Sequence, residues 1–223
     1  MLFASSILPG SLQLALLVIM LPSVIVAIRY AKWHLLLASR TRQHLFFGGM
    51  LAALLLWQLR IQVVDGVWIH LLGMTALTLV LGWCYAVIAG TLVALAYTLM
   101  AGESLLVVPG CWLFSVLIPA SVTRLLLLVI RRTNIQNLFL FLLGAGFGGA
   151  ALSVLLIAVV ALPVLWLGGQ GMWAREALTH APFILLVMFP EAFINGLIVS
   201  ALTVFYPDLV KTFDEDFYLD GRG

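Results

Sequence analysis

The 223-residue chain has 64% hydrophobic and only 9% charged residues, with a formal net charge of +2. Soluble domains contain about 45–50% apolar and about 25% charged residues, so this composition excludes a soluble protein. Backbone polar groups in lipid need partners within the chain, so only helices or closed barrels cross a bilayer. The apolar runs are continuous over about 18 or more residues, which predicts helices rather than barrel strands. So few charges give no indication of nucleic-acid binding.

The N-terminal segment is predicted to be a retained helix rather than a signal peptide. No basic residue precedes the apolar run Ser11–Ile28, and the first one, Arg29, follows it. No small-residue cleavage site lies in the right place. We therefore expect the first helix over residues 11–30, with Pro22 as a kink.

The next helices follow from the lengths of the apolar runs. The second is expected over Leu45–Ile61, and the polar connection Gln62–Gly66 follows it. The stretch Val67–Ala101 is too long for one span at about 1.5 Å rise per residue. We therefore divide it at Gly82–Trp83 into a short third helix and a full fourth helix.

Three more helices complete the bundle. They are expected over Leu105–Ile130, Ile135–Leu167 and Ala181–Phe205. The sixth is over-long, which predicts a steep tilt or a break near Pro163. A loop, Gly168–His180, precedes the last helix, and a short acidic tail over 207–223 follows it. The chain is thus expected to be one transmembrane helical-bundle domain, residues 1–223.

The positions of the basic residues predict the topology. With about seven spans and the N-terminus outside, most of the 11 Lys and Arg residues fall on the cytoplasmic side. These are Arg29, Lys32, Arg40, Arg42, Arg124, Arg131, Arg132, Lys211 and Arg222. Only Arg60 and Arg175 fall outside. We therefore predict an all-α integral membrane protein with its N-terminus outside and its C-terminus in the cytoplasm.

One histidine stands out as a candidate metal ligand. His70 is expected early in the third helix, near the outer face, and Met74 follows four residues later. Residues at this spacing share one helix face. An imidazole and a thioether together can hold a soft or borderline transition metal. Chance spacing in a Met-containing helix is the plainer interpretation.

The other histidines and the acidic residues of the loops have plainer interpretations. His34 and His44 lie in the basic loop and are expected to be interfacial anchors, and His180 a residue at a helix end. Asp65 belongs to an Asp-Gly turn. Glu103 lies in a turn that is expected to cap the next helix.

Polar and small residues inside the spans indicate contacts between helices. Glu191 and Asn195 are four residues apart in the seventh helix, where a carboxylate and an amide need partners. An interhelical hydrogen bond is one interpretation, and a polar site or a subunit contact is the other. Gly144 and Gly148 form a GxxxG pair that allows close helix approach, within the bundle or against a partner.

Enzymatic activity is not expected. The sequence contains no nucleotide-binding P-loop, no HExxH, no GxSxG and no Cys-x-x-Cys. Its two cysteines, Cys84 and Cys111, lie in apolar runs, which favours buried structural thiols over a disulfide framework. No covalently bound cofactor is expected.

Three segments resemble one family. Ile61–Trp83 is similar to the Ser-His-Pro-Thr-Gly segment of cobalt/nickel energy-coupling-factor permeases of the CbiM/NikM type, in which His70 takes the place of the histidine. His180–Val210, which contains PEAFINGL, resembles the last helix of that family, and Phe114–Ala120 its fifth helix.

The resemblance implies a seven-helix bundle that captures a transition-metal ion as substrate. It implies a coupling permease and cytoplasmic ATPases as partners, often with a small helper membrane subunit, in the cell (inner or plasma) membrane. The Arg131–Arg132 turn would then meet the coupling subunit. In the family the metal is held by the N-terminal amine, a histidine after the initiator methionine, and the histidine matching His70.

The sequence departs from the family at the second residue. Leu2 stands where the family has that second histidine, and the core is Ile-His-Leu-Leu-Gly. A softer metal held by His70, Met74 and either Met1 or Cys84 is one outcome. A substrate other than a metal, or a bundle that no longer transports, are the others.

Two functions are compatible with the resemblance and with the departure at Leu2. The first is the substrate-binding membrane component of such a transporter. The second is a non-transporting accessory or assembly subunit built on the same fold. A stand-alone channel or carrier is a weaker third, because few polar residues lie within the spans.

Overall fold

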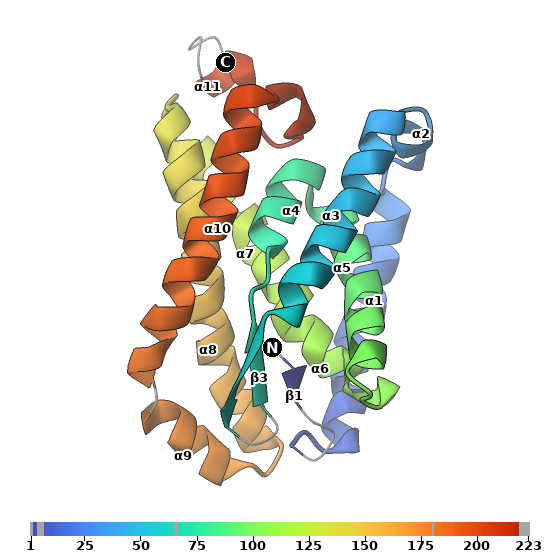
Figure 1. Ribbon diagram of the computed structural model, residues 1–223, viewed down its shortest axis with the longest axis vertical. Helices are drawn as coiled ribbons and strands as arrows, with labels where there is room; N and C mark the ends of the chain where they lie inside the picture. The colour runs from blue at the N-terminus through green and yellow to red at the C-terminus, as the bar shows by residue number, and fades with distance from the viewer. Residues whose placement is uncertain (1, 4–6, 65–66, 180, 219–223) are drawn as a thin grey trace.

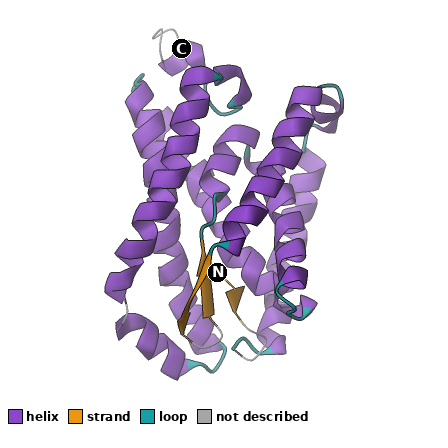
Figure 2. Ribbon diagram, viewed as in Figure 1, coloured by secondary structure: helices purple, strands orange, loops and turns teal. Residues whose placement is uncertain are grey.

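The computed structural model describes residues 2–3, 7–64, 67–179 and 181–218. Long helices run side by side along its longest axis, and a small β-sheet lies towards one end (Figures 1 and 2). The α-helices are α1 (Gly10–Tyr30), α2 (Trp33–Leu37), α3 (Arg40–Gln58), α4 (Met74–Leu81), α5 (Trp83–Met100), α6 (Val108–Trp112), α7 (Ile118–Arg132), α8 (Gly149–Leu167), α9 (Gly171–Thr179), α10 (Ile184–Phe205) and α11 (Glu215–Tyr218). The strands are β1 (Leu2–Phe3), β2 (Arg60–Val64) and β3 (Val67–His70).

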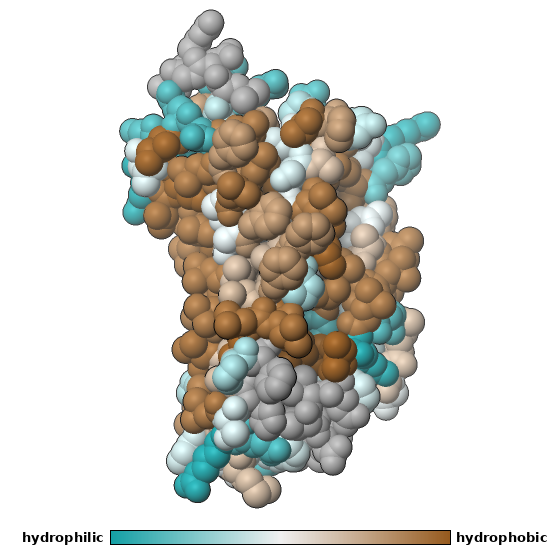
Figure 3. All heavy atoms as spheres, turned by 60° about the vertical axis from the view of Figure 1, so that its left-hand side comes forward, coloured by the Kyte–Doolittle hydropathy of each residue, from teal (hydrophilic) through white to brown (hydrophobic). Residues whose placement is uncertain are grey.

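Among the described residues, five helical segments are long and apolar enough to cross a membrane. They are Gly10–Tyr30, Trp83–Met100, Leu105–Arg132, Leu140–Leu167 and Ile184–Phe205. In Figure 3 apolar side chains cover most of the middle of the visible face, which we call the belt, and hydrophilic side chains gather towards its two ends. This is the surface of a multi-pass membrane protein, because lipid contacts the belt and water the ends.

Two segments of the bundle do not meet the length and hydropathy of a span. Helix α3 begins with the polar residues Arg40–His44, and α4 has only 8 residues. At about 1.5 Å per residue α4 is about 12 Å long, less than half of a hydrocarbon core of about 30 Å. Strand β3 leads directly towards α4, so the two together run through the bundle (Figure 1).

The sheet was not expected from the sequence. Strands β2 and β3 form an antiparallel hairpin, with Arg60 opposite His70 and Ile61 opposite Ile69. They flank the Asp-Gly pair, which is a strong hairpin signal. Asp65 itself lies outside the described residues. The prediction that Ile61 ends a helix and that the third helix contains His70 is therefore wrong, because both residues lie in strands.

The start of the chain completes this sheet. Strand β1 pairs with β3, with Leu2 opposite Trp68 and Phe3 opposite Val67. This antiparallel register directs the start of the chain towards the end of β3 that carries His70. Met1 lies outside the described residues.

Helix α4 is buried along its whole length. Such a short helix leaves unpaired N–H groups at one end and unpaired C=O groups at the other. At its C-terminal end, the N–H of Lys211 donates to the carbonyl of Val80 at 3.0 Å, and the N–H of Thr212 to that of Leu79 at 3.2 Å. The segment after α10 therefore closes one end of α4. The predicted division at Gly82 is confirmed, since α4 ends at Leu81 and α5 begins at Trp83.

Prolines and π-helical turns shape the two longest segments. Pro109 stands in the first turn of α6, where a missing N–H is tolerated, and Pro119 comes just after a π-helical turn. The π-helical turn η2 (Leu113–Leu117) joins these helices. In the next segment the irregularity is a π-helical stretch, η3 (Leu140–Gly148), and Pro163 lies within α8 without ending it. The predicted loop 168–180 contains helix α9.

Most basic side chains gather at one end of the bundle, which we call the basic end. The hydroxyl of Tyr85 donates to the carbonyl of Lys32, and the Lys211 amine lies 4.8 Å from the Tyr85 ring. Arg131 donates to the carbonyl of Thr212 at 2.7 Å. The opposite end, which we call the hairpin end, holds the turn between β2 and β3 together with α9 (Figure 1). Arg60 begins β2, opposite His70, and Arg175 belongs to α9.

The segment predicted to be an acidic tail packs on the basic end as far as Tyr218. Its side chains form an aromatic cluster, in which Phe213 and Tyr218 stack at 5.5 Å and both lie 5.2 Å from Phe141 of η3. Tyr218 is buried. The aromatic cluster therefore holds in place the segment whose Lys211 and Thr212 bond to the end of α4.

Candidate metal site

His70 lies at the end of β3, in the interior of the bundle. Its side chain is only 3% exposed. The imidazole stacks on Trp57 of α3 with ring centroids 4.6 Å apart, and it meets the Tyr97 ring of α5 edge-on at 5.1 Å. An ionisable residue at membrane depth that faces the bundle interior indicates a functional site.

The contacts of the ring determine which nitrogen faces the interior. Nδ1 lies 3.2 Å from the carbonyl oxygen of Leu71, which can only accept a hydrogen bond. This contact places the proton on Nδ1, so the lone pair of Nε2 faces the hydroxyl of Ser115, 3.3 Å away. Nε2 is therefore the atom oriented to bind a cation, and the Nδ1 contact fixes the tautomer, as in many metal sites.

The loop that follows His70 is held from two helices. The indole N–H of Trp57 donates to the carbonyl of Leu72 at 2.9 Å. The carboxylate of Glu191 on α10 accepts the N–H of Leu72 at 2.7 Å and that of Gly73 at 3.0 Å. Gly73 has φ = 65°, a left-handed conformation that favours glycine. Trp57 and Glu191 thus fix the backbone between His70 and α4.

Asn195 extends this contact into α4. Its Oδ1 accepts the N–H of Ala76 at 2.8 Å, and its Nδ2 donates to the carboxylate of Glu191 at 2.6 Å. The carboxylate and amide therefore provide an N-terminal cap for α4 from a neighbouring helix. Glu191 thus bonds the loop before α4, and Asn195 bonds α4 itself.

Met74 does not share a helix face with His70. The two are separated by the Leu71–Gly73 loop, and Met74 is the first residue of α4. Its side chain is fully buried, and its Cε lies 3.0 Å from the position that a Cβ on Gly90 would take. The structural reason for pairing the two residues is thus wrong, while a metal role for Met74 stays a prediction.

The structure places a different sulfur four residues before Ser115, the residue whose hydroxyl contacts His70. Cys111 of α6 is 1% exposed, and its thiol is hydrogen-bonded to the side chain of Ser115. Cys84 instead lies in the first turn of α5, next to Tyr85 and Lys211 at the basic end. The sequence gave no signal for Cys111, Ser115 or Trp57 as neighbours of His70, because Trp57 and the Cys111–Ser115 pair come from elements far from His70 in the chain. Among the described residues, no group of three or more His, Cys, Asp and Glu side chains is arranged as a metal site.

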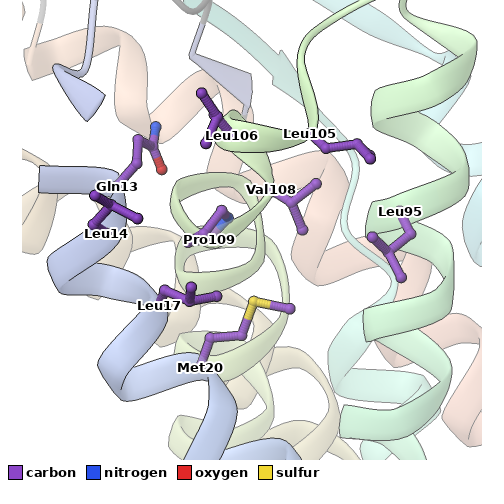
Figure 4. A pocket seen from close by; sticks show the side chains of 9 residues that line it. All are labelled: Gln13, Leu14, Leu17, Met20, Leu95, Leu105, Leu106, Val108 and Pro109. Carbon is purple, nitrogen blue, oxygen red and sulfur yellow. The ribbon is translucent and has the colours of Figure 1, made fainter. Parts of the chain in front are cut away.

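An apolar cavity of about 190 Å³ lies close to this region, between α1, α5 and α6. Figure 4 shows its lining, in which Gln13 is the one polar residue among leucines, Met20, Val108 and Pro109. Gln13 is 2% exposed, and its Oε1 accepts the N–H of Gly110 at 2.9 Å. The cavity holds no charged side chain and is therefore no candidate for the metal.

The remaining candidates lie elsewhere. Gly144 faces Ile130 of α7, and a Cβ on Gly148 would meet only the backbone of its own helix. A Cβ on Gly146 would lie 3.6 Å from the Cα of Gly196, so η3 and α10 approach each other closely there. Arg131 and Arg132 end α7. The exposed side chains of His34 and His44 lie on α2 and α3, and His180 lies outside the described residues.

Comparisons with known proteins agree with this arrangement. A family model described as "Cobalt uptake substrate-specific transmembrane region" (CbiM) matches residues 4–209. A crystal structure of a truncated transition metal transporter has the same fold, with a TM-score of 0.74 and 19% identity over 92% of this chain and 99% of that one. Among curated proteins none matches. Because the family model covers nearly the whole sequence, this chain belongs to the CbiM family of cobalt-uptake transmembrane proteins.

Proposed function

We propose that the protein is the substrate-binding membrane component of an energy-coupling-factor transporter, and that it takes up a transition-metal ion through His70. The observation that carries the proposal is the orientation of Nε2, fixed by the contact between Nδ1 and the Leu71 carbonyl and by stacking on Trp57. Ionisable side chains at membrane depth are costly and mark functional sites, and a histidine with a fixed tautomer is a prepared ligand.

The distribution of charge supports the orientation of the chain. The basic end carries the ends of α1, α2 and α7 with their lysines and arginines. Under the positive-inside rule this end faces the cytoplasm. The site then lies on the side of the outer hairpin end, as expected of an uptake protein in the cell membrane. The proposed count of about seven spans consists of the five long apolar segments, α3, and the segment formed by β3 and α4.

The same end is the surface for the partners. ATP hydrolysis requires cytoplasmic ATPases and a coupling permease, since the chain has no nucleotide-binding motif. Arg132 at the end of α7 is exposed, and Arg131 beside it is attached to the C-terminal segment through Thr212. We infer that the coupling permease contacts Arg132 and the segment that closes α4. A small helper membrane subunit belongs to the same assembly.

A non-transporting accessory subunit is the second candidate, and Leu2 favours it. In strand β1, Leu2 offers no donor atom to a metal where the family resemblance expects a histidine. On this alternative His70 is a structural residue that pairs with Ser115.

The metal content of the purified protein distinguishes the transporter component from the accessory subunit. Detergent-purified protein is incubated with Ni²⁺, Co²⁺, Cu⁺ or Zn²⁺, desalted and measured by mass spectrometry. We expect one of these ions near one per chain in the wild type, loss of it in His70→Ala, and no change in His44→Ala, which alters a histidine at the basic end. If wild-type protein holds none of the four ions, the metal-capture function is wrong and the accessory role replaces it.

A further inference from the structure

A buried sulfur and a buried nitrogen converge on one hydroxyl group. The Ser115 side chain contacts Nε2 of His70 at 3.3 Å and is also hydrogen-bonded to the thiol of Cys111. All three side chains are at most 3% exposed. Cys111 and Ser115 are four residues apart in one helical segment, and the fold brings His70 at the end of β3 to them.

The backbone around Cys111 is held in place. Gly110, the preceding residue, donates its N–H to Gln13 of α1, and a Cβ at this position would lie 3.1 Å from both the Gln13 amide and Leu8. Nε2 of Gln13 is buried, and within the described part of the chain it has no hydrogen-bond partner. Figure 4 shows Gln13 beside the turn of α6 that contains Pro109. The thiol is therefore on a well-supported helix turn with an additional polar atom nearby.

The surrounding elements also bring the N-terminal strand to this place. Helix α6 packs against β1, and β1 is hydrogen-bonded to β3, which ends at His70. The strand that begins the chain is thus wedged between the elements that carry Cys111 and His70. Here Leu2 contributes no donor atom, which leaves the nearby sulfur as a replacement.

We propose that Cys111 is a metal ligand together with His70, and that its thiolate makes the site selective for a thiophilic cation such as Cu⁺ or Zn²⁺. The proposal rests on the metal-capture function proposed above. Thiolate ligands favour Cu⁺ and Zn²⁺, whereas imidazole alone also suits Ni²⁺. Glu191, whose carboxylate would attract harder ions, is already bonded to the amides of Leu72 and Gly73.

Both donors contact the same hydroxyl group, that of Ser115. Metal bonds of about 2.0 Å to imidazole nitrogen and about 2.3 Å to thiolate sulfur require Nε2 and the sulfur to lie within about 4.3 Å of each other when a cation is bound, so the hydroxyl has to leave the space between them. That hydroxyl turns aside by rotation about χ1. The cation replaces the thiol proton, which is released, so the bound form contains thiolate and neutral imidazole.

Cysteine variants provide the first test. We expect Cys111→Ser to lower the affinity for Cu⁺ and Zn²⁺ at least about tenfold and to leave binding of Ni²⁺ less affected. Cys84→Ser is the matched control, because this cysteine lies at the basic end beside Lys211, and it should bind like the wild type. Unchanged Cu⁺ and Zn²⁺ affinity in Cys111→Ser overturns the proposal.

Spectroscopy of the wild type provides a second test that does not depend on the folding of a variant. With Co²⁺ as the probe, a sulfur ligand gives a thiolate-to-metal charge-transfer band in the near ultraviolet, which the thioether of Met74 does not give. We expect the band in the wild type and in Cys84→Ser. Binding of Co²⁺ that needs His70 but shows no such band refutes the role of Cys111 alone, whereas absence of binding by any ion refutes the function of the site as a whole.

Discussion

The carboxylate of Glu191 and the backbone N–H of Leu72 are 119 residues apart in the chain and 2.7 Å apart in the structure. This hydrogen bond joins α10 to the loop that positions His70. Glu191 and Asn195 accept hydrogen bonds from backbone N–H groups at the start of α4. The N–H groups of Lys211 and Thr212 donate to backbone carbonyls at its end. Residues from the last third of the chain thus provide the hydrogen-bond partners for both ends of α4.

Removing Glu191 should destabilise the loop and α4. In Glu191→Ala the N–H groups of Leu72 and Gly73 lose their acceptors in a buried place, at a cost of about 1–3 kcal/mol for each unsatisfied group. Glu191→Gln keeps one acceptor oxygen and should lie between the wild type and alanine. Thermal unfolding in detergent measures the effect, with Phe193→Leu on the lipid-facing side of α10 as the control. Equal melting temperatures for wild type and Glu191→Ala would contradict this role.

Trp57 should affect metal binding more than stability. Trp57→Phe keeps an aromatic ring against His70 but removes the N–H that donates to the Leu72 carbonyl at 2.9 Å. Residues that orient a metal ligand typically contribute 10–100-fold to affinity, so we expect a loss of about tenfold or more. Isothermal titration with the metal measures it.

Trp33→Phe is the matched control for this experiment. Its indole N–H also donates to a backbone carbonyl, that of Ile28 at 2.9 Å, but at the basic end. We expect normal metal affinity in this variant. If both tryptophan variants weaken binding equally, the effect is a general loss of stability rather than the orientation of His70.

The contact between Gly196 and Phe147 sets the distance between α10 and η3. A Cβ at Gly196 would overlap the Phe147 ring, so Gly196→Ala should cost about 1–3 kcal/mol through overpacking. Gly48→Ala on α3 is the control, because nothing lies within 4 Å of a Cβ there, and removal of a helical glycine should stabilise by about 0.5–1 kcal/mol. Denaturant titration of the two variants should give shifts of opposite sign, and shifts of the same sign would argue against this packing.

Lys211 should give the basic end a measurable pH dependence. Burial lowers the pKa of this amine below its ordinary value of 10.5, the Cys84 thiol opposes that effect, and the charges of Lys32 and Arg42 add to it. Between the lowered pKa and 10.5, the unfolded chain binds more protons than the folded one. Stability therefore rises with pH through this interval.

The substitution Lys211→Met tests this dependence. Methionine is an unbranched side chain of similar length that can still pack over Gly82 and the Tyr85 ring, but it carries no charge. Melting temperatures from neutral pH to about pH 10 should rise in the wild type relative to the variant. Parallel curves would show that the amine titrates in the folded protein as it does in the unfolded chain.

Local properties of the sequence were sufficient for the class of the protein and most of its helices. Continuous apolar runs predicted α1, α5 and α10 within a few residues, and the break at Gly82 followed from span length alone. The gathering of basic residues in the segments of the basic end was also visible in the sequence. These features depend on each segment's own transfer from water to lipid, so they can be read one segment at a time.

Tertiary structure decided how the candidate site is built. From the sequence, His70 was predicted to be a metal ligand on the same helix as Met74. In the structure, pairing between β1, β2 and β3 makes His70 the last residue of a strand. Cys84, one ligand that the sequence suggested, lies at the basic end beside Lys211, whereas Cys111 lies four residues from Ser115, which contacts His70. Which donors meet depends on contacts between segments far apart in the chain, and in a sequence where almost every helix is apolar, hydrophobicity alone does not distinguish one helix neighbour from another.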